Sequence, residues 1–103
     1  MKIVLITACL AGVAHSKMAA IALKNEAIVR GHEIEVEEQG GHKIPVKLTQ
    51  EQIDAADLVI VAKAVSISGK ERLKNKKVLD VNVNKAVRNP KEILDKAEEL
   101  YNQ

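Results

Sequence analysis

The chain has 103 residues, a size typical of one domain, and we therefore predict a single domain over residues 1–103. Its formal charge is only +2 and Tyr101 is its only aromatic residue, so nucleic acid is not an expected partner. One cysteine can form no internal disulfide, and the first apolar run is far too short to span a bilayer. We expect a cytoplasmic protein without direct membrane insertion.

The first half of the chain predicts two strands that flank a helix. Lys2–Ala8 (KIVLITA) is almost continuously apolar, as in a strand that is buried on both faces. From Ala14 to Arg30 apolar residues recur at roughly helical spacing, and Gly31 supplies a C-terminal stop. These apolar residues are Met18, Ile21, Ala22, Ala27 and Ile28. His32–Glu38 alternates polar and apolar residues, which predicts a half-exposed edge strand, and residues 39–47 are predicted as a loop.

The second half predicts two more strands and two helices. Thr49 with Gln52 three residues later is a capping-box pattern, which indicates a short helix. Leu58–Ala62 is a fully apolar strand, and a polar connection with one helical turn leads to a fourth strand, Val78–Val83. Pro90 is expected at the first position of the last helix. The apolar stripe of that helix is Ile93, Leu94, Ala97 and Leu100.

Strands that alternate with helices predict an α/β fold with three layers, α/β/α, around a four-stranded parallel sheet. The two-sided apolarity of Lys2–Ala8 places this strand in the centre, which gives the strand order 2-1-3-4. In such sheets, ligands bind beyond the carboxyl ends of the strands, where the winding reverses. The fold therefore predicts a phosphate-cradling loop directly after the first strand, starting at Cys9.

Cys9 opens the segment CLAGVAHSKMAA, residues 9–20, at a junction from strand to helix. The unpaired N–H groups and the dipole of a helix N-terminus bind anions and favour a thiolate. Gly12 would let the backbone approach a ligand closely. Cys9 is thus a candidate nucleophile, with the alternative that it is a small buried apolar residue at a strand end.

Other chemistries of small α/β domains leave recognisable patterns. The chain lacks the G-x-G-x-x-G sequence of dinucleotide-binding proteins after the first strand, and the spacing of its His, Cys and Asp residues predicts neither a metal nor an organic cofactor. Cysteine phosphatases place an arginine and a hydroxyl residue after Cys-x₅, where this chain has His15 and Ser16. Without the arginine that clamps the transferring phosphoryl group, hydrolysis should be poor, so a phosphoryl group on Cys9 would persist.

The residues of this loop resemble those of fructose-family enzyme IIB components of the phosphoenolpyruvate-dependent sugar phosphotransferase system (PTS). The family loop reads approximately C-P-T-G-[IV]-A-H-T-F-M-A-A. The resemblance extends to VEEQGG (36–41), LTQEQIDAADLVIVA (48–62) and KERLKNKKV (70–78), and so covers most of the chain.

The resemblance implies that Cys9 accepts a phosphoryl group from a phosphohistidine of a IIA protein. Cys9 would then pass the group to fructose or a fructose-like sugar bound by the membrane permease IIC, which would hold this chain at the inner face of the membrane. The phosphate-binding residues would be Leu10, Ala11, Gly12, Val13, Ala14, His15 and Ser16. Lys17, Lys63 and Lys70 are further candidates for positions near the phosphate.

Three loop residues depart from the family: Leu10, Ala11 and Lys17 replace its proline, threonine and phenylalanine. These departures leave a second hypothesis open, a diverged IIB-like regulatory or binding module with weak phosphoryl relay or none. A cysteine phosphatase is the third hypothesis.

Overall fold

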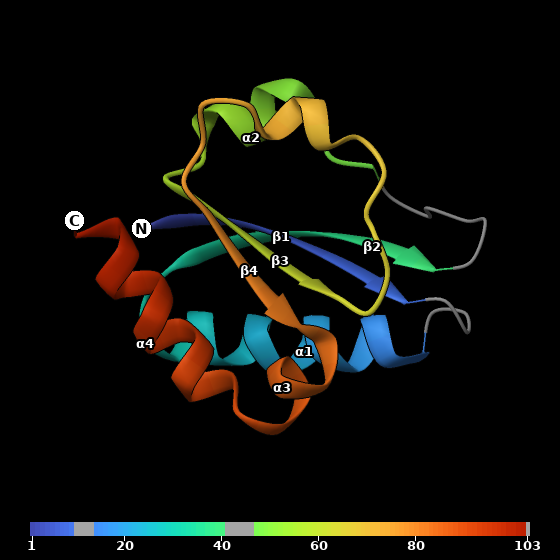
Figure 1. Ribbon diagram of the computed structural model, residues 1–103. Helices are drawn as coiled ribbons and strands as arrows, with labels where there is room; N and C mark the ends of the chain where they lie inside the picture. Colours follow the sequence, from blue (N-terminus) through green and yellow to red (C-terminus); the bar gives the residue numbers. More distant parts are fainter. Residues whose placement is uncertain (10–13, 41–46, 103) are drawn as a thin grey trace.

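The computed structural model describes residues 1–9, 14–40 and 47–102, in which a four-stranded sheet lies between two layers of helices (Figure 1). The strands are β1 (Lys2–Cys9), β2 (Glu33–Gly40), β3 (Leu58–Lys63) and β4 (Val78–Asn82). Their order is β2-β1-β3-β4, and every neighbouring pair is parallel. The predicted fold class and strand order are confirmed.

The two faces of the sheet are covered unequally. One face packs against α1 (Ala14–Val29), α3 (Val83–Arg88) and α4 (Pro90–Tyr101). Among the described residues, the other face packs only against α2 (Gln50–Ala55) and the 3₁₀ helix η1 (Lys70–Leu73), with the segments beside them. The second face, here called the α2 face, therefore has no long helix among the described residues.

Strand β1 is buried on both faces because its side chains alternate between two apolar clusters. Ile3 and Leu5 belong to the cluster under α1, α3 and α4, and Val4 and Ile6 belong to the cluster under α2. By the same alternation, Cys9 at the end of β1 lies on the α1 face.

Helix α1 packs on the sheet through three alanines and Leu23, and of these Ala27 alone is among the residues that suggested the helix. Its buried residues are Ala19, Ala20, Leu23 and Ala27. Met18 and Ile21 are each 51% exposed, and Ile28 is also exposed. The helix itself is confirmed, but the sequence pattern identified only Ala27 of its buried face, because alanines allow close packing and count little in an apolar pattern.

Several predicted boundaries are shifted by one or two residues, and two of these shifts change the interpretation. Gln39 and Gly40 belong to β2, and not to a loop, because they continue the register with Ala8 and Cys9. Strand β4 ends at Asn82, and Val83 begins an unpredicted helix, α3. The side chain of Asn82 accepts a hydrogen bond of 2.8 Å from the N–H of Asn84 and so caps that helix.

The predicted starts of helices α2 and α4 are confirmed. The Thr49 side chain accepts from the Gln52 N–H at 3.1 Å, and the Gln52 side chain accepts from the Thr49 N–H at 2.8 Å, which completes the capping box of α2. Pro90 is the first residue of α4. The residues of its predicted stripe, Ile93, Leu94, Ala97 and Leu100, are buried or packed against the core.

Candidate functional site

Cys9 is the last residue of the central strand β1, and its partner in the parallel register is Gly40, the last residue of β2. Its side chain is 5% exposed. On the other side of β1, the N–H of Ala64 donates a hydrogen bond of 2.8 Å to the Ala8 carbonyl oxygen. The thiol is therefore placed at the carboxyl edge of the sheet, on a strand end that is held from both sides, as the sequence predicts.

The predicted phosphate-binding residues are only partly within the described chain. Leu10, Ala11, Gly12 and Val13 lie outside the described residues. The backbone of Ala14, His15 and Ser16 forms the start of α1. Helix α1 thus begins five residues after Cys9, and the assignment of residues 10–16 as a phosphate cradle stays a prediction.

Two buried polar atoms lie on the same face of the sheet as Cys9. Thr7 and Glu38 are register partners on β1 and β2, two positions before the pair of Cys9 and Gly40. Within the described chain, Thr7 Oγ1 and Glu38 Oε1 are buried without a hydrogen-bond partner. Thr7 itself is fully buried. Sequence reasoning missed these atoms, although a threonine inside a continuously apolar strand is a visible signal.

A buried ion pair lies on the α2 face of β2, close to the same edge. The Arg72 guanidinium donates from Nη1 and Nη2 to the two carboxylate oxygens of Glu37, each at 2.8 Å. The Glu37 side chain is fully buried and that of Arg72 is 10% exposed. The alternation of residues 32–38 had placed Glu37 on a half-exposed face, and this expectation is wrong because Arg72 and the segment before α2 cover it.

Glu37 remains in its charged form because its partners outweigh its burial. Burial alone raises the pKa of the carboxyl group, but hydrogen bonds from Arg72, Gln39 and the Leu48 N–H bring the Glu37 pKa below its ordinary value. The hydrogen bond to Glu37 likewise raises the pKa of Arg72. Both side chains, the Glu37 carboxylate and the Arg72 guanidinium, are therefore charged at neutral pH.

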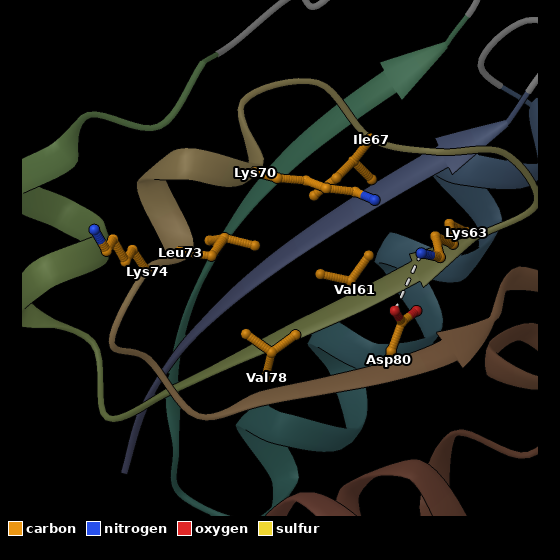
Figure 2. A pocket seen from close by; sticks show the side chains of 8 residues that line it. All are labelled: Val61, Lys63, Ile67, Lys70, Leu73, Lys74, Val78 and Asp80. Atoms are coloured by element: carbon orange, nitrogen blue, oxygen red, sulfur yellow. Dashed lines mark ion pairs between the residues drawn. The ribbon is translucent and has the colours of Figure 1, made fainter.

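A cavity of about 290 Å³ opens over β3 and β4 on the α2 face (Figure 2). Its lining residues are Val61, Lys63, Ile67, Lys70, Leu73, Lys74, Val78 and Asp80. Lys63 Nζ lies 3.1 Å from Asp80 Oδ2. Of the three lysines that the sequence suggested, Lys63 and Lys70 lie at this cavity, whereas Lys17 is exposed on α1. The cavity lies on the sheet face opposite to the Cys9 side chain.

A family model described as "PTS system, Lactose/Cellobiose specific IIB subunit" matches residues 4–96. The chain is 41% identical to the "PTS system fructose-like EIIB component 2" of Escherichia coli K12, over 94% of this chain and 92% of that protein. It is 45% identical to the "PTS system fructose-specific EIIABC component" of Bacillus subtilis, over 93% of this chain but only 15% of that longer protein. A crystal structure of a domain of the fructose-specific IIABC component from Borrelia burgdorferi superposes with a TM-score of 0.88 at 40% identity, over 98% and 93% of the two chains.

The chain therefore belongs to the IIB family of the sugar phosphotransferase system. The family description names lactose and cellobiose, whereas these relatives carry fructose in their names. The identities above 40% extend over most of this chain, so the fructose type of these relatives describes it better than the lactose and cellobiose wording of the family description. None of the helices in the described part of the chain combines the length and the apolarity needed to cross a membrane.

Proposed function

We propose that this chain carries a phosphoryl group on Cys9 between a IIA donor and a sugar bound by the permease IIC. The observation that carries the proposal is the position of Cys9 at the carboxyl end of the central strand, five residues before α1 begins, in a chain of the IIB family. Parallel sheets of this kind bind ligands at that edge, and a helix N-terminus favours a phosphoryl group.

The relay consists of two displacements at phosphorus. The Cys9 thiolate attacks the phosphohistidine of IIA, so that an S–P bond forms and the P–N bond breaks, and the leaving imidazole nitrogen takes up a proton. A hydroxyl oxygen of the sugar then attacks the same phosphorus, the S–P bond breaks, and the hydroxyl proton is released as the thiolate returns. Backbone N–H groups of residues 10–16 and the Ser16 hydroxyl would bind the phosphoryl oxygens.

Membership of the IIB family extends this proposal to the sugar, the partner components and the location. The sugar is fructose or a fructose-like hexose, in line with the names of the relatives. The IIA and IIC partners correspond to the letters A and C in the name of the B. subtilis relative, in which all three components share one chain. The IIC component would hold this chain at the cytoplasmic face of the membrane.

A reconstituted relay tests the proposal. Labelled phosphoenolpyruvate, the general PTS proteins, a fructose-type IIA and membranes that contain IIC are mixed with the wild type or with Cys9→Ser, and labelled sugar phosphate is measured. We expect product with the wild type and none with Cys9→Ser. A chain that accepts the label on Cys9 but forms no sugar phosphate would support the second hypothesis, a regulatory or binding module.

A further inference from the structure

The strongest polar feature outside the thiol site is the Arg72 cluster, here defined as Glu37, Gln39, Leu48, Ser68, Gly69 and Arg72. In addition to its two bonds to Glu37, Arg72 donates from Nη1 to the Leu48 carbonyl at 3.0 Å. Arg72 Nε donates to the Gly69 carbonyl at 3.0 Å and Nη2 donates to the Ser68 carbonyl at 3.2 Å. The guanidinium thus joins β2, the segment before α2 and the segment between β3 and η1.

The cluster extends along β2 toward the position of Cys9. Gln39 Nε2 donates to Glu37 Oε2 at 2.7 Å and to the Ser68 carbonyl at 3.0 Å. Gln39 Oε1 accepts from the Ser68 N–H at 2.8 Å. Gln39 directly precedes Gly40, which is the register partner of Cys9.

These contacts join the two segments that flank the end of β1. On one side lies the end of β2, at Gln39 and Gly40, and on the other lies Ala64, which bonds to Ala8. The chain from Ala64 continues to Ser68, where Gln39 holds its backbone. Through Ser68 and Arg72, the two flanks of the Cys9 strand end become one connected unit.

Stability alone does not account for such a buried ion pair. Desolvation of two charges largely offsets their attraction, and apolar residues of similar volume often serve the fold as well. The Arg72 cluster instead fixes the relative orientation of the segments that it joins, because a bidentate pair of guanidinium and carboxylate allows little freedom of geometry. In the described part of the α2 face, only short helices cover the sheet, so no long helix fixes the orientation of these segments.

We propose that Glu37 and Arg72 are positioning residues, which hold the carboxyl ends of β1, β2 and β3 so that Cys9 is correctly placed for phosphoryl transfer. This inference rests on the proposed function of Cys9. It assigns to the Arg72 cluster no contact with the phosphoryl group. Its effect passes through Gln39 and Ser68 to the two flanks of Cys9.

The test compares Arg72→Met with a matched control, Arg30→Met. Arg30 also sits among carboxylates, at 2.7 Å from Glu26, 2.8 Å from Asp95 and 3.1 Å from Glu98. It lies between the end of α1 and the start of β2, at the edge of the sheet opposite to Cys9. Each variant is assayed at a temperature where circular dichroism shows it to be folded, and the single-turnover rate of transfer from saturating phosphorylated IIA to the chain is measured.

We expect Arg72→Met to slow transfer about tenfold or more, since a misplacement of about 1 Å can cost ~100-fold. Arg30→Met should transfer at the wild-type rate, although it also loses ion pairs. Equal rates for the folded Arg72→Met and Arg30→Met variants would overturn the inference. If Arg72→Met fails to fold, Arg72→Lys and the isosteric Glu37→Gln replace it under the same criterion.

A second readout separates this inference from the proposed function. Cys9 is the only cysteine, so the rate of its alkylation by iodoacetamide reports on the strand end without any partner protein. If the wild type accepts no phosphoryl group, the proposed function fails, and alkylation alone tests the positioning role. We then expect alkylation several-fold faster in Arg72→Met than in Arg30→Met, and equal rates would overturn the role.

Discussion

Gly69 and Arg72 fit together so closely that a Cβ atom added to Gly69 would lie 2.6 Å from Arg72 Nε. Gly69 also has a φ of 77°, a left-handed conformation that favours glycine. The absence of a side chain at Gly69 thus leaves room for the guanidinium to reach Glu37. Glu37 lies three residues before the end of β2 at Gly40.

The first prediction concerns this fit. Gly69→Ala should destabilise the fold by about 2–5 kcal/mol, the sum of about 1–2 kcal/mol of left-handed strain and about 1–3 kcal/mol of overpacking. Gly31→Ala is the matched control, because Gly31 has a φ of 81° but nothing within 4 Å of an added Cβ. The Gly31→Ala variant should lose only the part of the unfolding free energy that comes from the left-handed strain. Urea unfolding of both variants measures the difference, and equal losses would refute the argument from Arg72.

The second prediction is a pH dependence. The pKa of Glu37 is lower in the folded chain than its ordinary value of 4.5, so the unfolded chain binds more protons between these two pKa values. The stability from Glu37 is therefore fully present above about pH 4.5 and is lost as the pH falls through the folded pKa. Urea unfolding of the wild type and Glu37→Gln from pH 7 to pH 3 should show a stability difference that shrinks below pH 4.5. A difference that stays constant over this range would contradict the assignment.

The third prediction concerns Thr7, whose buried hydroxyl has no partner in the described part of the chain. Thr7→Val replaces the hydroxyl by a methyl group of similar size. Because a buried unpaired hydroxyl costs about 1–3 kcal/mol, the variant should be as stable as the wild type or more stable by about 1 kcal/mol. Thermal unfolding measures this effect. A loss of more than about 1 kcal/mol would mean that the hydroxyl is paired in solution.

Patterns local in sequence predicted most of the fold. The two-sided apolarity of Lys2–Ala8 placed β1 in the centre, and the pair Thr49 and Gln52 located the start of α2. These signals act over a few residues and depend little on the rest of the chain. Helix α3 was missed because its cap, Asn82, is itself the last residue of β4, so no loop marks the change from strand to helix.

The candidate site was predictable only in part. The position of Cys9 follows from its place after an apolar strand, and the resemblance to IIB loops added its chemistry. The pairing of Glu37 with Arg72 joins residues 35 positions apart, and no local pattern indicates it. It arises because the fold brings η1 over β2, and burial then makes each charge depend on the other.

The central claim is that Cys9 carries the phosphoryl group. Intact-mass measurement after incubation with a phosphorylated fructose-type IIA protein tests it most directly. We expect the wild type to gain the mass of one phosphoryl group and Cys9→Ser, which removes the thiol, to remain unlabelled under the same conditions. A wild type that gains no phosphoryl group from any such donor, or a Cys9→Ser variant labelled to the same extent, would contradict the claim.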